Sequence, residues 1–407
     1  MDVDGSPHLE LPVSLAKNLE LLRQLPKLDG FRLREFGLGA SAASPLEEVT
    51  GFGSNPGQLR MYSFVPAQLQ QPRALVVVLH GCGQTAAAYD LGAGWSTLAN
   101  HYGFALVMPE QQRSNNANTC FNWFNTEDIT RDSGEAQSIR EMIAHMAEAH
   151  GIDARRVFIT GLSAGGGMTS VMLATYPEVF AAGAVVAGLP YGIATNLREA
   201  LDGMFHSPDR PARELGDLVR QASNHRGPWP KISVWHGSAD RTVNPGNANA
   251  IVKQWLDLHG LPGAPMAETI VDGYPRQTWW DKDGETVVES YAITGMSHGT
   301  PLGMADNDQR YGVEGAFLIE AGISSSYHIA KFFGLTGWIP NLATKKAAAK
   351  SAPTPKPVTA LSPAPHLARS IRSAVADQPA KPNPEKGRSL DISAVITRAL
   401  TAAGLMK

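Results

Sequence analysis

The segment Val157-Phe-Ile-Thr-Gly-Leu-Ser-Ala-Gly-Gly166 is the most informative part of this sequence. Its first residues are apolar and β-branched, as in a buried strand, and they lead into a G-x-S-x-G pattern, Gly161-Leu-Ser-Ala-Gly165. In that pattern a serine occupies a strained turn between a strand and a helix, and small flanking residues let the two elements pass close together. The following residues suit a helix whose N-terminus favours negative charge at the serine. The pattern predicts Ser163 as a nucleophile; the alternative is a structural serine in a tight turn.

Apolar segments on both sides of this stretch predict an alternation of strands and helices. Strands are expected at 59–65, 74–79, 105–108, 157–160, 182–186, 232–235 and 286–293, and helices near 92–102 and 133–150. The run at 74–79 is continuously apolar, which is typical of a strand buried on both faces. The alternation predicts an α/β fold with a mostly parallel, doubly wound sheet and helices on both faces.

Composition predicts four regions: an N-terminal extension at 1–50 with a short helix at 10–28, a main domain at 51–340, a disordered Ala/Pro/Lys linker at 341–388 and a terminal segment at 389–407. The linker cannot bury enough apolar surface to fold. The terminal segment has apolar residues at helical spacing, so it is either a short helix that docks on a partner or surface, or a frayed tail. Within the main domain, 191–228 is either a helical insertion over the rim of the site or a crossover helix with long loops.

Charge and hydropathy exclude several classes of partner. The 407 residues are 43% hydrophobic and 18% charged, with a formal net charge of -3, which gives no reason to expect nucleic acid or an anionic membrane surface. No apolar run approaches the roughly 20 residues that span a bilayer, so no transmembrane segment is expected. No Cys, His and Asp spacing suggests a metal, and no glycine-rich phosphate loop follows a first strand.

A serine nucleophile requires a base, a carboxylate that orients the base, and donors for the oxyanion. Asp240 follows the strand at 232–235, at the edge of the sheet where α/β active sites form, and is the predicted acid; the alternative is a turn or helix-cap aspartate. Asp272, in a hairpin-like stretch, is the weaker candidate. His298 ends a strand in a glycine-flanked loop and is the predicted base.

The loop His80-Gly-Cys-Gly-Gln84 follows an early strand and is predicted to form half of the oxyanion hole. Its glycines let the backbone approach the substrate, so the expected donors are the N–H groups of Cys82 and of Ala164, the residue after the nucleophile. His80 is expected to hydrogen-bond loop backbone, and His236 to be structural. From their number alone, Cys82 and Cys120 are either a disulfide or two reduced, buried thiols.

Four segments together resemble the polyhydroxybutyrate (PHB) depolymerase family of esterases: Leu79-His-Gly-Cys-Gly-Gln84, the loop from Pro109 to Phe124, Gly161-Leu-Ser-Ala-Gly-Gly166 and Gly295-Met-Ser-His-Gly299. The resemblance covers roughly residues 50–335. It implies an α/β-hydrolase fold, ester hydrolysis through Ser163, Asp240 and His298, Cys82 at the oxyanion position, and no cofactor. The family's paired cysteines in these loops also imply a Cys82–Cys120 disulfide and an extracellular or periplasmic location. The first residues lack the pattern of a signal peptide, which leaves a cytoplasmic location as the alternative.

The sequence therefore predicts a serine esterase that acts through an acyl-enzyme on PHB-type polyesters, their oligomers or related short-chain esters. The alternatives are a feruloyl or acetylxylan esterase on the same scaffold, and a non-catalytic binding protein of the same fold. Because no polymer-binding domain is recognisable after the catalytic unit, soluble oligomers and other esters are included. Aromatic residues suit an apolar substrate chain, so four are predicted to line the cleft unless they pack in the core: Trp123, Phe124, Trp279 and Trp280.

Overall fold

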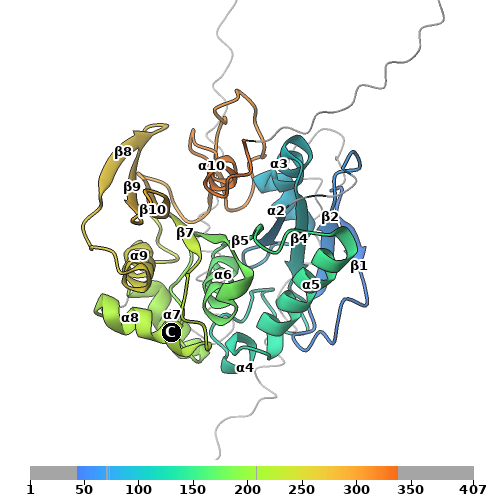
Figure 1. The fold of residues 1–407 in the computed structure, drawn as a ribbon, viewed down its shortest axis with the longest axis horizontal. Helices are drawn as coiled ribbons and strands as arrows, with labels where there is room; N and C mark the ends of the chain where they lie inside the picture. Colours follow the sequence, from blue (N-terminus) through green and yellow to red (C-terminus); the bar gives the residue numbers. More distant parts are fainter. Residues whose placement is uncertain (1–43, 70–71, 73, 208, 338–407) are drawn as a thin grey trace, which may run out of the picture. The chain divides into compact units, whose positions relative to one another are not determined.

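The computed structural model describes residues 44–69, 72, 74–207 and 209–337 (Figure 1). A boundary between compact units follows Ser44, and every element described below belongs to the unit that begins at Pro45. Three predicted segments lie outside the described residues: the helix at 10–28, the linker at 341–388 and the terminal segment at 389–407.

Ten strands form one mixed sheet in the order β1-β2-β4-β3-β5-β6-β7-β10-β9-β8. They are β1 (Glu47–Val49), β2 (Arg60–Phe64), β3 (Leu75–Leu79), β4 (Ala105–Glu110), β5 (Val157–Leu162), β6 (Ala182–Val186), β7 (Lys231–Gly237), β8 (Ala267–Val271), β9 (Tyr274–Trp280) and β10 (Thr286–Ile293). From β4 to β10 the neighbours pair in parallel, whereas β1 and β2 at one end and β9 and β8 at the other pair antiparallel. The predicted mostly parallel sheet is confirmed, and its first strand begins before residue 51.

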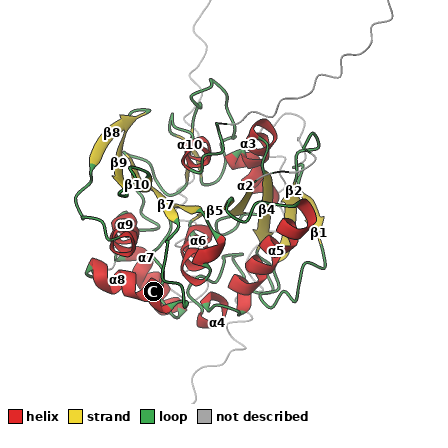
Figure 2. Cartoon of the chain, in the orientation of Figure 1, coloured by secondary structure: helices red, strands yellow, loops and turns green. Residues whose placement is uncertain are grey.

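Helices cover both faces of this sheet, as predicted (Figure 2). One face packs against α4 (Thr126–Ile129), α5 (Gly134–His150), α6 (Ala164–Thr175), α7 (Leu197–Phe205), α8 (Ala212–Gln221) and α9 (Gly246–His259), and the other against α2 (Ala86–Ala93), α3 (Trp95–Tyr102) and α10 (Ser325–Phe332). In β3, Val77 faces the first core and Val76 and Val78 face the second. Alternation across two apolar cores explains why the central strands are apolar at every position.

The helix predicted at 92–102 is two helices, α2 and α3. Gly94 lies between them with φ 78°, and a Cβ at this position would lie 1.3 Å from the carbonyl oxygen of Tyr311. A close backbone approach therefore breaks the helix where only glycine fits. Among the described residues, no helix is long and apolar enough to cross a membrane.

The segment at 191–228 contributes two helices, α7 and α8. Helix α8 packs on α9, where Arg220 lies 2.6 Å from Asp257, so this part is an ordinary crossover helix. Helix α7 instead touches the loop after β7, because the N–H of Asn244 donates to Met204 O at 2.7 Å and Asn247 Nδ2 donates to Gly203 O at 2.9 Å. It thus supports the loop that carries Asp240 and the first turn of α9.

A second, smaller sheet of two parallel strands, β11 (Thr300–Leu302) and β12 (Leu318–Glu320), follows β10. The first of these strands begins directly after the loop that carries His298. The N–H of Thr300 donates to Phe317 O at 2.8 Å, which ties the end of that loop to the second strand.

Candidate active site

Ser163 occupies a strained turn between β5 and α6. Its backbone has φ 58° and ψ -116°, a conformation that residues with side chains rarely adopt. A Cβ on Gly161 would lie 2.3 Å from Gly165 O, and one on Gly165 would lie 2.4 Å from Leu79 O. The N–H of Ser163 donates to Val186 O at 2.9 Å. The predicted strand–turn–helix setting is therefore present, and neighbouring strands hold the strained residue in place.

Asp240 and His298 are hydrogen-bonded to each other at the same edge of the sheet. His298 Nδ1 lies 2.7 Å from Asp240 Oδ2, and both side chains are buried. The other carboxylate oxygen, Oδ1, accepts hydrogen bonds from the N–H groups of Thr242 at 2.8 Å and Val243 at 2.9 Å. Both predicted residues follow parallel strands, β7 and β10, so their position at one edge is a consequence of strand direction.

A third side chain, His236, reaches the same carboxylate. Its Nε2 lies 3.1 Å from Asp240 Oδ2 and 2.9 Å from Val243 O. Burial alone would raise the pKa of Asp240, but the hydrogen bonds from His236 and His298 outweigh it and hold the pKa below its ordinary value. Asp240 is therefore ionised at neutral pH. This contact was not predicted, although the available signal was that Asp240 follows His236 closely, in the loop directly after the end of β7.

The loops after β7 and β10 are bonded directly to each other. The N–H of Ser238 donates to Ile293 O, and the N–H of Ala239 donates to Met296 O, both at 3.0 Å. A Cβ on Gly237 would lie 2.3 Å from Met296 O, so this contact requires glycine. The backbone thus fixes the acid loop relative to the base loop independently of their side chains.

Cys82 and Cys120 form a disulfide, with their Cα atoms 4.3 Å apart, which confirms the predicted pairing. The bridge joins the loop after β3 to the long loop after β4, and the N–H of Gly83 donates to Asn118 O beside it at 2.8 Å. Within the described part of the chain, the backbone N–H groups of Cys82 and Ala164 have no protein acceptor. Their role as oxyanion donors stays a prediction.

Two buried side chains, those of His80 and Glu135, form hydrogen bonds with the loops after β3 and β4. His80 Nδ1 donates to Gly81 O at 2.8 Å and its Nε2 accepts from the N–H of Gln111 at 3.1 Å, as expected for a residue that bonds loop backbone. Burial lowers the pKa of His80 to about 4. Glu135, which the sequence analysis missed, accepts from Asn122 N at 2.9 Å and from Asn122 Nδ2 at 2.8 Å. Burial, helped by a neighbouring carboxylate, raises the pKa of Glu135 to about 8 against the effect of these donors.

Comparison with known proteins gives the family. The family model described as esterase PHB depolymerase matches residues 60–272. The chain belongs to this family. It is 46% identical over 301 residues to poly(3-hydroxyalkanoate) depolymerase C of Paucimonas lemoignei, covering 74% of this chain and 72% of that one. It is 30% identical over 282 residues to feruloyl esterase B of Talaromyces stipitatus, covering 67% of this chain and 77% of the relative.

The same family resemblance extends to solved structures. The acetyl xylan esterase from Aspergillus awamori superposes with a TM-score of 0.59 at 26% identity, covering 71% of this chain and 99% of that chain. The sheet order, the helices on both faces and this likeness confirm the predicted α/β-hydrolase fold.

The prediction that Trp279 and Trp280 line the substrate cleft beside His298 is wrong. Trp280 pairs with Thr286, at the start of β10, whereas the site lies at the other end of that strand, beyond Ile293. Seven residues at about 3.3 Å each separate the two ends by roughly 23 Å. Trp279 is also buried, and its Nε1 donates to Ala264 O at 2.9 Å.

The other two aromatic residues lie in the loop that follows the disulfide. Trp123 is buried, and its ring fills the space beside Gly167 of α6, so it offers little surface to a substrate. Phe124 is half-buried and packs edge-on against Trp123, with ring centroids 5.5 Å apart. Contact of Phe124 with substrate remains a prediction.

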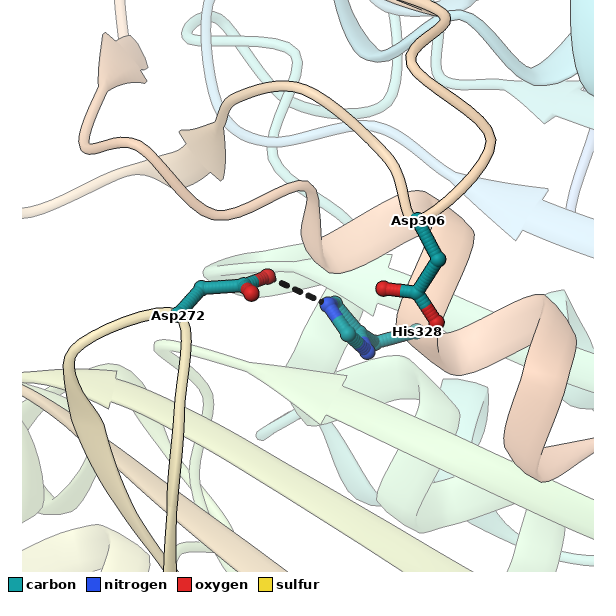
Figure 3. A group of neighbouring side chains, drawn as sticks. All are labelled: Asp272, Asp306 and His328. Atoms are coloured by element: carbon teal, nitrogen blue, oxygen red, sulfur yellow. Dashed lines mark hydrogen bonds and ion pairs between the residues drawn. The ribbon is translucent and has the colours of Figure 1, made fainter.

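The weaker acid candidate, Asp272, has a different partner. It lies in the turn between β8 and β9, and His328 Nε2 of α10 donates to its Oδ2 at 2.8 Å (Figure 3). Asp306 completes a group whose ligand atoms lie within 4.8 Å of one another, a spacing that a metal ion could use. Lys331 Nζ, however, lies 2.6 Å from Asp306 Oδ2. Both carboxylates are thus already compensated by protein donors, and Asp272 is not available to His298.

Proposed function

We propose that this chain is a serine esterase that hydrolyses PHB-type polyesters, their oligomers or related short-chain hydroxyalkanoate esters. The observation that supports the chemistry most strongly is the strained Ser163 turn at the same sheet edge as the bonded Asp240–His298 pair. Strands β5 and β7 are two positions apart in the sheet, about 10 Å, which a chain of hydroxyl, imidazole and carboxylate can bridge.

In the proposed mechanism, His298 accepts the proton of Ser163 Oγ as the oxygen attacks the ester carbonyl. The N–H groups of Cys82 and Ala164 stabilise the oxyanion, and ionised Asp240 orients the imidazole and stabilises its protonated form. His298 then protonates the leaving alcohol, and an acyl-enzyme remains. Water, deprotonated by His298, hydrolyses it and regenerates Ser163.

The substrate proposal rests on similarity. The relative named as a poly(3-hydroxyalkanoate) depolymerase is 46% identical, whereas the relative named as a feruloyl esterase is 30% identical. Feruloyl or acetylxylan ester hydrolysis is the second candidate, favoured by the structural match to an acetyl xylan esterase. The disulfide supports a further proposal, that the protein works in an oxidising compartment outside the cytoplasm.

The test compares wild type with Ser163→Ala on hydroxybutyrate oligomers, PHB suspension, acetylated xylan and a feruloyl ester. We expect oligomer hydrolysis by wild type and a loss of kcat of several orders of magnitude in the variant, with unchanged folding. Ser114→Ala, at an exposed serine of the long loop, is the matched control and should keep full activity. Wild-type activity in Ser163→Ala would refute the mechanism, and turnover confined to acetylated xylan or feruloyl esters would refute the substrate class.

A further inference from the structure

The neighbours of the His236 ring indicate which of its two nitrogens donates a hydrogen bond. Its Nε2 faces two acceptors, Asp240 Oδ2 at 3.1 Å and Val243 O at 2.9 Å, so Nε2 carries the hydrogen. The other ring nitrogen, Nδ1, is buried without a partner in the described part of the chain. A proton there would be a buried donor with no acceptor, which is unfavourable. His236 therefore donates from Nε2, as in the Nε2–H tautomer.

This tautomer places four N–H donors around one carboxylate. Backbone N–H groups of Thr242 and Val243 hold Oδ1, while His298 and His236 both donate to Oδ2. The negatively charged Oδ2 thus accepts hydrogen bonds from two imidazole rings. A carboxylate oxygen that receives a second donor attracts the first proton less strongly.

We propose that His236 is a positioning residue of the catalytic site, which holds Asp240 Oδ2 toward His298 and weakens the pull of this oxygen on the His298 proton. This inference rests on the proposed function. The titratable side chains that act on Asp240 are those of His236 and His298. The His298 ring also packs edge-on against the uncharged ring of Phe317, with ring centroids 5.8 Å apart. The effect of His236 on the base is therefore transmitted through Asp240.

The kinetic test uses His236→Leu, which removes the donor, and two amide variants. The amide nitrogen of Gln reaches the place of Nε2, whereas that of Asn reaches only the place of Nδ1. We expect kcat on a soluble ester to fall about tenfold or more in His236→Leu and His236→Asn with little change in KM, and the acidic limb of the pH profile of kcat/KM to move upward by roughly half a unit or more. His236→Gln should restore both to near wild type.

The matched control is His259→Leu, which removes another histidine–backbone bond, from Nε2 to Pro230 O at 3.1 Å, at the other end of β7 from the site. It should lower stability without moving the acidic limb. If His236→Leu does not fold, the contrast between Gln and Asn still decides the matter. Equal pH profiles and equal kcat in His236→Gln, His236→Asn and wild type would overturn the inference.

A second measurement does not depend on activity. Nitrogen NMR of the wild-type protein with labelled histidine should show the His236 hydrogen on Nε2, and a ring with its hydrogen on Nδ1 alone would overturn the inference. If wild type lacks esterase activity, or Ser163→Ala keeps it, the proposed function fails while the tautomer still tests the contact. If the esterase depends on Ser163 but ignores His236, only this inference fails.

Discussion

Removing the Cys82–Cys120 bridge should lower stability by about 4 kcal/mol. Replacing both cysteines by alanine keeps the backbone N–H at position 82 and changes only the side chains. The bridge spans a sequence separation of 38. In the loop-closure model, a closed loop of that length removes entropy from the unfolded chain worth about 4 kcal/mol at 25 °C. The bond from the N–H of Gly83 to Asn118 O, at 2.8 Å, remains and holds part of the native loop geometry.

Guanidinium unfolding followed by tryptophan fluorescence would measure this loss, with wild type, reduced wild type and the double variant in parallel. Reduced wild type and the variant should agree closely, because both lack the cross-link and differ only in the two thiol groups. Under conditions where all are folded, kcat on a soluble ester should fall by less than the roughly 100- to 1000-fold that a missing oxyanion donor costs. A stability loss below about 1 kcal/mol would refute the entropy argument. Alkylation of both thiols in native wild type without reductant would refute the bridge itself.

Two further predictions concern loop anchors. His80 has a pKa of about 4 in the folded protein against an ordinary value of 6.5. As the pH falls, the unfolded chain therefore binds a proton at this residue before the folded chain does. The contribution of His80 to the free energy of unfolding is complete above pH 6.5 and falls by about 3 kcal/mol as the pH drops to 4. His80→Gln, which keeps an acceptor for the N–H of Gln111, should lack this slope in urea unfolding between pH 4.5 and 7, and an unchanged slope would contradict the assignment. Gly237→Ala places a Cβ 2.3 Å from Met296 O, so the two loops must separate and kcat should fall at least tenfold with KM little changed. Gly263→Ala, where nothing lies within 4 Å, is the control, and equal kinetics in the two variants would count against the loop contact.

The central strands and the serine turn could be predicted because their signals are local. The apolar run of β3 needs two covered faces, and the glycines around Ser163 need close neighbours, wherever the rest of the chain lies. The break at Gly94 could not be predicted, because the atom that requires it belongs to Tyr311, more than two hundred residues away. The same holds for Glu135, whose partners come from a loop that the sequence shows only as polar.

His236 shows a different limit. The sequence places it at the end of a strand, which is correct, but a strand-end histidine can point into the core, into solvent or toward a neighbouring loop. Its contact with Asp240 depends on the tight turn between them, in which the N–H of Asp240 approaches Gly237 O at 3.2 Å. Turn geometry of this kind is not encoded by residue type alone.

Strand direction explains where the predicted site residues lie in the sheet. Parallel strands all end at one edge, so Ser163, Asp240 and His298 lie there because each follows the end of a parallel strand. Strand β9 runs antiparallel to β10, so its last residue, Trp280, lies at the opposite edge although only β10 and its flanking turns separate it from His298 in the chain. The same reversal brings the β8–β9 turn, with Asp272, to the edge that carries the site. Asp272 was therefore a reasonable competitor for the acid by position, and it is excluded by its hydrogen bond to α10 rather than by its place in the sheet.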